Sequence, residues 1–261
     1  MFSRLATVSA LVLWAGAAPF AALAQDAPVI AAAADLKFAL DEIAAAFQAA
    51  SGRKLRLNFG SSGNIASQLR QGAPFELFLS ADEGFVFQLA DAGRTLDRGT
   101  LYAEGRIVLF TPAGSPLTPD GSFNDLRAAL ADGRLQHFAI ANPEHAPYGR
   151  AAEQALKGQG LWEAIQPKLV LGENVAQAAQ FAASGSAQGG IIAYSLARSP
   201  TLAPLGRHAL IPSEWHAPLR QRMVLMKGAG DTAKAFYAYL QSQAARTILR
   251  KHGFDVPREA A

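Results

Sequence analysis

The sequence contains no cysteine, and this absence excludes both a disulfide framework and a thiolate metal site. Charged residues are also sparse, at 17% of the chain, and the formal net charge is only +3. The lysines and arginines are scattered and form no basic stripe, so nothing indicates a nucleic-acid partner. The five histidines show no metal-ligand spacing. No motif predicts a cofactor, since a relaxed dinucleotide fingerprint at Gly228–Ala233 is followed by too short a chain for a dinucleotide domain.

Long apolar runs are missing from residue 25 onward, so no later segment is expected to span a bilayer. The first residues differ. Arg4 supplies a positive start, Leu5–Ala22 is largely apolar, and Ala22–Ala24 has the small-x-small form of a secretory cleavage site. We therefore predict a signal peptide over residues 1–24 and a secreted mature chain that begins near Gln25. A retained membrane anchor is the alternative.

The rest of the chain is long enough for two modest domains or one large one. Seven short runs in it predict β-strands: Val29–Ala33, Leu55–Phe59, Glu76–Ser80, Arg106–Thr111, His137–Ala141, Gly190–Tyr194 and Arg222–Lys227. Between these runs apolar residues recur at helical spacing, as Leu36, Leu40, Ile43 and Phe47 do. Several strands are apolar throughout, which is typical of strands buried on both faces. The alternation of strands and helices predicts an α/β protein with mostly parallel sheets.

Four turns that lead from a strand into a helix concentrate small and polar residues. The most informative is Gly60–Gly63, with two serines between two glycines, because Ile65 and Leu69 begin a helix directly after it. Hydroxyls and free backbone N–H groups at the positive end of a helix form a place for an anion. The other three turns are Ala33–Leu36, Pro143–Gly149 and Gly172–Val175. Ligands of open α/β sheets bind beyond the carboxyl ends of strands, so two lobes facing each other would bring the four turns together.

Several longer segments carry a family pattern: Ala32–Leu40, Gly60–Asn64, Gly72–Asp82, Asn142–Gly149 and Lys251–Phe254. With them, essentially the whole mature chain resembles the periplasmic molybdate-binding proteins of ABC transporters. The resemblance implies a type II periplasmic-binding-protein fold, with two α/β lobes that each hold a mostly parallel sheet flanked by helices. Lobe I would be discontinuous, residues 26–103 and 220–261, and lobe II would be residues 104–219. Two crossovers are expected near Tyr102–Arg106 and His216–Arg222.

The function implied by this resemblance is that of a periplasmic receptor, not of an enzyme. The receptor would bind molybdate, and tungstate comparably, in the cleft between the lobes, with no directly coordinated metal cation. Hydroxyls and backbone N–H groups would hold the four oxygens of the dianion. Closure of the lobes would bury it, and the closed form, a monomer, would dock on the membrane permease of an ABC importer.

Site residues follow from the resemblance position by position. Ser62 matches the serine of the second loop, Tyr148 a backbone N–H that sometimes comes with a tyrosine hydroxyl, and Val175 the backbone donor of the fourth loop. Two positions depart from the family pattern. Asp35 stands where many members have a serine, and Ala193 stands where some have a tyrosine. Tyr194 follows one place later, and one step along a strand reverses the face to which a side chain points.

Asp35 is the more serious departure, because a carboxylate beside a dianion is repulsive. The sequence leaves three explanations open. The side chain caps the helix Leu36–Ala50 and leaves its own N–H to the ligand. Alternatively, it accepts a hydrogen bond from a protonatable oxyanion such as phosphate or arsenate. Finally, the ligand is not an anion.

An enzyme is the rival class of protein. One serine of Gly60–Gly63 could act as a nucleophile with His145 as its base, which would make the protein a serine-dependent hydrolase. The segment lacks the G-x-S-x-G elbow, and no acid partner can be identified from the sequence.

Overall fold

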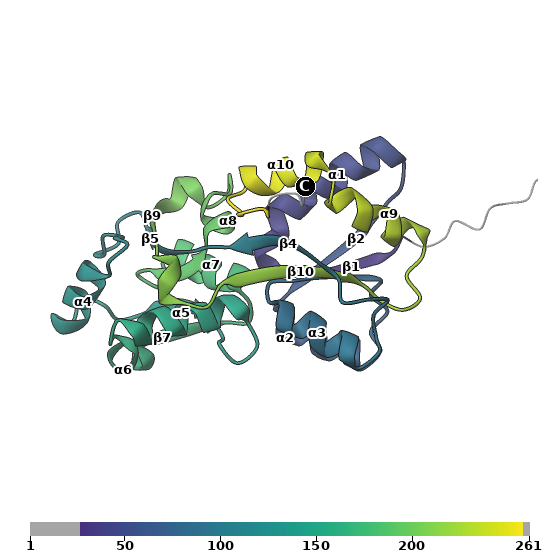
Figure 1. The fold of residues 1–261 in the computed structure, drawn as a ribbon. Helices are drawn as coiled ribbons and strands as arrows, with labels where there is room; N and C mark the ends of the chain where they lie inside the picture. The colour runs from purple at the N-terminus through teal and green to yellow at the C-terminus, as the bar shows by residue number, and fades with distance from the viewer. Residues whose placement is uncertain (1–26, 258–261) are drawn as a thin grey trace, which may run out of the picture.

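The computed structural model describes residues 27–257, which form two lobes lying side by side (Figure 1). Each lobe is built on one five-stranded sheet flanked by helices, which confirms the predicted α/β fold class. The predicted signal peptide lies outside the described residues. Within residues 27–257, no helix combines the length and the apolar character needed to cross a membrane.

The sheet of lobe I joins strands from both ends of the described chain. In spatial order it holds β2 (Arg56–Gly60), β1 (Val29–Ala33), β3 (Leu77–Ser80), β10 (Leu219–Leu225) and β4 (Thr100–Gly105). β1 pairs parallel with β2 and β3, whereas β10 is antiparallel to both of its neighbours. Its helices are α1 (Lys37–Ser51), α2 (Ser62–Arg70), α3 (Glu83–Asp91), α9 (Asp231–Leu240) and α10 (Gln243–Lys251). The central strands are apolar because these helices cover both of their faces.

Lobe II repeats this plan with residues from the middle of the chain. In spatial order its sheet holds β7 (Leu169–Gly172), β6 (Phe138–Ala141), β8 (Gly190–Ala193), β5 (Ile107–Pro112) and β9 (Gly206–Leu210). β6 pairs parallel with β7 and β8, and β5 is the antiparallel strand. The helices of this lobe are α4 (Asn124–Ala131), α5 (Pro147–Gly158), α6 (Trp162–Ile165), α7 (Val175–Ala183) and α8 (Tyr194–Ala197).

In each sheet the antiparallel strand is the first strand after the chain crosses from the other lobe. β4 ends at Gly105 and β5 begins at Ile107, so only Arg106 separates a strand of one sheet from a strand of the other. The chain returns through residues 211–218, between β9 and β10. In Figure 1, β4 and β10 run side by side toward lobe II. The two connections lie close to the crossovers expected from the sequence.

The strand-to-helix turns of both lobes face the space between them. α2 follows β2, α5 follows β6, and α7 follows β7, each after a short turn. β1 leads into a 3₁₀ turn, Ala34–Leu36, before α1 begins. Since the carboxyl ends of these strands point toward the opposite lobe, the helix N-termini meet there.

Candidate functional site

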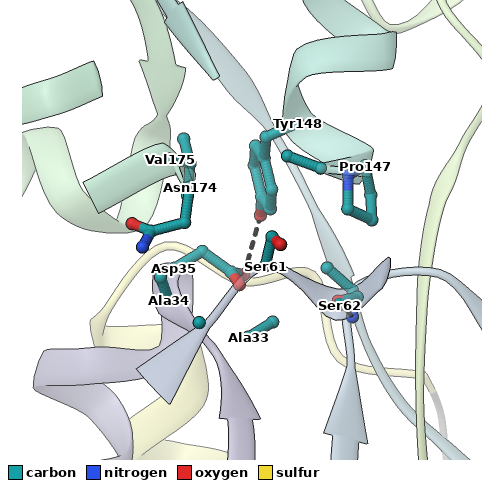
Figure 2. Close-up of a pocket in the computed structure, with 12 residues that line it drawn as sticks. Ala33, Ala34, Asp35, Ser61, Ser62, Pro147, Tyr148, Asn174 and Val175 are labelled. Carbon is teal, nitrogen blue, oxygen red and sulfur yellow. Dashed lines mark hydrogen bonds between the residues drawn. The ribbon is translucent and has the colours of Figure 1, made fainter. Parts of the chain in front are cut away.

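A small pocket lies where the two lobes meet (Figure 2). Its lining comes from all four turns singled out in the sequence and from the end of β3: Ala33, Ala34, Asp35, Gly60, Ser61, Ser62, Ala81, Ala146, Pro147, Tyr148, Asn174 and Val175. None of these residues is a lysine, arginine or histidine. A ligand in this pocket would therefore be held by neutral hydrogen-bond donors and helix N-termini rather than by a cationic side chain.

Ser62 is the first residue of α2 and is completely buried. Its hydroxyl oxygen accepts a hydrogen bond from the backbone N–H of Ala81 at 2.9 Å. A hydroxyl can both accept and donate, so this contact leaves the Ser62 proton for a bond to a ligand. The neighbouring Ser61 is engaged differently, because its hydroxyl lies 2.9 Å from Nδ1 of His145 in lobe II.

Two helices of lobe II present their first turns to the same pocket. At α7 the side chain of Asn174 accepts hydrogen bonds from the N–H groups of Ala176 and Gln177. That cap leaves the N–H of Val175 unused. At α5, proline occupies the first position and Tyr148 the second, and Tyr148 is buried. Its ring points from α5 toward Asp35 of the opposite lobe in Figure 2.

The structure corrects the hypothesis that Asp35 caps a helix. Asp35 lies inside the 3₁₀ turn, and the residue that caps α1 is Leu36, which makes no side-chain cap. The Asp35 carboxyl instead accepts hydrogen bonds at Oδ2 from the hydroxyl of Tyr148, at 2.9 Å, and from Nε2 of Gln221, at 2.6 Å. Gln221 is oriented in turn by the hydroxyl of Tyr102, which donates to its Oε1 at 2.7 Å.

Burial raises the pKa of the Asp35 carboxyl from its ordinary value of 3.8 to about 6, although the hydrogen bonds from Gln221 and Tyr148 act in the opposite direction. The same burial, together with the charge of Asp35, raises the pKa of Tyr148 and of Tyr102 well above the usual tyrosine value. Both tyrosines therefore stay neutral and act as donors at physiological pH. The second carboxyl oxygen, Oδ1, is buried and has no hydrogen-bond partner.

Tyr194, the remaining predicted site residue, does not line this pocket. It is the first residue of α8, its ring packs against that of His208 with centroids 5.6 Å apart, and its hydroxyl accepts a bond from Arg198. The residue after it does reach the site, because the Ser195 hydroxyl donates to the backbone carbonyl of Asp35 at 2.8 Å.

Gln221 and Ser195 are two site residues that the sequence analysis missed. Ser195 directly follows a predicted strand, but nothing in that segment indicates a contact with Asp35, far away along the chain. Gln221 is completely buried in β10, at a register shift between Gln221 and Arg222 where β10 pairs with β4. Bulges of this kind re-aim side chains. The sequence contained one indication of this role, because Gln221 is a polar residue within the expected crossover His216–Arg222.

The hydrolase alternative requires a serine, a histidine base and an acid that orients the histidine, and the structure provides only the first two in contact. Ser61 is hydrogen-bonded to Nδ1 of His145, and Nε2 of His145 lies 3.7 Å from a carboxylate oxygen of Glu173. That distance is too long for a hydrogen bond, and the Glu173 side chain is largely exposed, so no buried acid orients the imidazole. The contact is better described as a bridge between the lobes.

The described residues were also compared with the ligand clusters that hold metal ions in proteins. Within residues 27–257, no three or more His, Asp or Glu side chains gather where they could hold a metal ion. What the pocket offers is a set of hydroxyl and backbone donors around a small volume. Such a set suits a compact oxyanion that has lost its hydration shell.

Two α/β lobes joined by two crossings of the chain, with a donor-lined pocket between their helix N-termini, define a two-lobed solute-binding protein. The family model described as bacterial extracellular solute-binding protein matches residues 28–255, and the chain belongs to this family.

Curated relatives match nearly the full length of the chain. The molybdate-binding protein ModA of Azotobacter vinelandii is 35% identical over 254 residues, which cover 96% of this chain and 98% of that protein. ModA of Escherichia coli (strain K12) is 34% identical over 257 residues, covering 94% and 97%. Among solved structures, the periplasmic molybdate-binding protein of A. vinelandii superposes with a TM-score of 0.80 at 30% identity, covering 88% of this chain and all of that one.

Proposed function

We propose that this protein is the molybdate receptor of an ABC importer, and that it binds tungstate comparably. The observation that carries the proposal is the meeting of four strand-to-helix turns around one small pocket with no cationic side chain. Ser62, Tyr148 and Val175 supply a hydroxyl and backbone donors, and the relatives of similar length are molybdate-binding proteins. Asp35 is the only ionisable carboxyl at the pocket.

The same proposal includes the location, the oligomeric state and the partner of the protein. The protein acts as a monomer in the periplasm, to which a signal peptide over residues 1–24 directs it, and it delivers its ligand to a membrane permease. Residues 26–103 and 220–261 form one lobe and residues 104–219 the other. The ligand undergoes no chemical change, so the protein is not an enzyme.

Binding on this proposal is coupled to closure of the lobes. Donors from lobe I, at the turn before α2, and from lobe II, at the N-termini of α5 and α7, line the same pocket. Closure removes water from the anion and strengthens each hydrogen bond to it.

The test is a thermal-shift series on the purified mature protein with molybdate, tungstate, sulfate, phosphate and arsenate. A ligand that binds only the folded state raises the Tm by mass action. Molybdate and tungstate should raise the Tm, and sulfate, which is smaller at equal charge, should raise it far less. No shift with either metal oxyanion at millimolar concentration would contradict the proposal.

Phosphate and arsenate form the second arm, because the Asp35 carboxyl at the pocket could accept a bond from a protonated oxyanion. A shift with these two anions and none with molybdate would leave the receptor class standing and replace the ligand.

A further inference from the structure

The two oxygens of the Asp35 carboxyl differ in their hydrogen bonding. Oδ2 accepts both hydrogen bonds, from Tyr148 and from Gln221. Oδ1 is buried without a partner, and the residue as a whole is only 1% exposed. A buried polar oxygen without a partner carries an energetic cost, so its presence in a pocket calls for an explanation.

No cationic side chain lines the pocket beside this carboxyl. The groups that face it from the packed elements are the Ser61 and Ser62 hydroxyls at α2, Tyr148 of α5, Asn174 and Val175 of α7, Ser195 of α8, and Gln221 of β10 with Tyr102 of β4 behind it. The titratable members are the two tyrosines, which remain neutral. His145 and Glu173 lie one contact further out, beyond Ser61.

We propose that Asp35 holds the oxyanion as a neutral carboxylic acid, with the proton on Oδ1 donated to the ligand, so that each bound dianion takes up one proton from solvent. This inference rests on the proposed function, since it requires a dianion in the pocket. The proton goes from water to Asp35, no other bond is made or broken, and the charge that enters the pocket is −2 for the anion and +1 for the proton.

Electrostatics around the pocket supports this assignment of the proton. Burial between the two lobes already raises the pKa of the carboxyl to about 6 without the charge of a bound anion. A dianion in contact with it adds like-charge repulsion, which raises the pKa further and favours the neutral form. The protonated group then becomes a donor, and the repulsion that made Asp35 a problem for the family resemblance disappears.

The hydrogen-bond pattern also fixes which oxygen carries the proton. Oδ2 is held by two donors that cannot accept a proton from it while they keep their present bonds: Tyr148 donates to it, and Gln221 is kept in one amide orientation by Tyr102. Only Oδ1 is free to become a hydroxyl. An asparagine at this position would present the same pattern permanently, with its carbonyl at the two donors and its amide N–H toward the ligand.

Proton uptake makes affinity depend on pH in a defined direction. Even when it is buried between the lobes the carboxyl has a pKa of about 6, so above pH 7 it is almost fully ionised before an anion binds, and each bound anion must recruit a proton. The affinity for molybdate should then fall about tenfold for each unit of pH between 7 and 8.5. Molybdate stays deprotonated across this range, so the anion itself contributes no slope.

Isothermal titration of the full mature chain with molybdate tests this inference. Titrations at pH 8 in buffers of different ionisation enthalpy give the number of protons taken up, which should be close to one. The key variant is Asp35→Asn, which removes the titrating group and keeps the donor pattern. It should bind molybdate with no proton uptake and no pH slope, and more tightly than wild type at pH 8, by about tenfold or more.

A matched control separates this effect from the loss of a charge. Asp41→Asn changes the same residue type in the same segment, at an exposed position paired only with Lys37. It should retain the wild-type slope and uptake. Because His145 is intact in all three proteins, a slope that persists in Asp35→Asn would assign the titration to another group and overturn the inference.

The remaining outcomes separate this inference from the proposed function. Tight molybdate binding by wild type with no proton uptake at pH 8 overturns the role of Asp35 and leaves the receptor function standing. Binding of hydrogen phosphate by wild type that Asp35→Asn abolishes shows that Asp35 accepts a proton from the ligand instead. If neither protein binds molybdate or tungstate at any pH, the proposed function fails together with the inference.

Discussion

Burial of the Asp35 carboxyl between the lobes links the stability of the closed form of the protein to pH. Its pKa is raised from 3.8 to about 6 on folding, so its contribution to stability is fully present below pH 3.8 and is lost as the pH rises through 6. A shift of about 2 units corresponds to about 3 kcal/mol. We expect ligand-free Asp35→Asn to melt at a higher temperature than wild type at pH 8. The gap should shrink between pH 6 and pH 4, and a gap that does not change with pH would show that the carboxyl does not titrate in this range.

Removing the Ser62 hydroxyl should weaken binding and also destabilise the lobe. Ser62→Ala loses one hydrogen bond to a charged ligand, worth about 1.5–3 kcal/mol, or roughly 10- to 150-fold in affinity. It also leaves the N–H of Ala81 without its acceptor in a buried place, which costs about 1–3 kcal/mol of folding free energy. Titration with molybdate and a melting curve measure the two losses.

Ser67→Ala is the control for that variant, since Ser67 lies on the same helix and its hydroxyl accepts a hydrogen bond from the Gln71 side chain, away from the pocket lining. It should leave molybdate affinity unchanged. Wild-type affinity in Ser62→Ala would place the anion away from the N-terminus of α2.

Local sequence could indicate the positions of the pocket residues but not the hydrogen-bond network among them. The turn that contains Ser62 and the segment that contains Tyr148 each predict a helix N-terminus. Glycine and serine are favoured just before a helix, and proline is favoured at its first position. The contact between Asp35 and Gln221 joins residues 186 positions apart. No local pattern encodes such a pair, and the cap predicted for Asp35 was wrong because tertiary donors outcompeted the nearby helix.

At the scale of elements, the strands that the sequence did not reveal lie at the edges of the sheets. β4 ends one sheet, and β7 and β9 end the other. Edge strands are half-exposed and need no continuous apolar run; β9, for example, reads Gly-Arg-His-Ala-Leu and is mostly exposed or partly exposed. The seven predicted runs all correspond to strands. Six of them agree with the observed bounds to within one residue at both ends, and the seventh, Arg222–Lys227, begins three residues after β10 does. A strand that is buried on both faces is a continuous apolar run and can be recognised in the sequence. A strand that is buried on one face is not, and is harder to recognise.

The close approach of α2 to the opposite lobe gives a prediction about closure. The N–H of Gly63 donates to the backbone carbonyl of His145 at 2.9 Å, and a Cβ on Gly63 would lie 2.6 Å from that same oxygen. Backbone cannot give way easily, so Gly63→Ala should hold the lobes apart. We expect at least a tenfold loss of molybdate affinity, with a radius of gyration by X-ray scattering that no longer decreases when ligand is added.

Gly158→Ala provides the matched control for that substitution. Gly158 ends α5, and an added Cβ there meets nothing within 4 Å. Its affinity and its ligand-dependent compaction should equal those of wild type. Normal compaction in Gly63→Ala would mean that the interface tolerates a methyl group and that Gly63 does not limit closure.

At the scale of the whole molecule, the two lobes are tied together by contacts that differ in character. Deep in the interface lie the Asp35 network and the bond from Ser195 to the Asp35 carbonyl. Nearer the surface, Asn64 bonds to Glu173 and Arg150 to Asp82, and these partly exposed pairs contribute little to stability. The bilobed plan could be predicted from the alternation of strands and helices and from the family resemblance. The contacts between the lobes could not be predicted, because they join residues that are far apart in the sequence and depend on how the two lobes pack together.

The place of β10 in its sheet has a consequence for the order in which the protein can be completed during synthesis. β4 pairs with β10 alone in the sheet, and β10 begins only at Leu219. All strands of the other sheet have emerged by Leu210. The lobe that begins the described chain is therefore completed last, and its sheet lacks β10 until residues 219–225 have been synthesised. A chain that stops at residue 218 should show amide protection against hydrogen exchange in β5–β9 and none in β4.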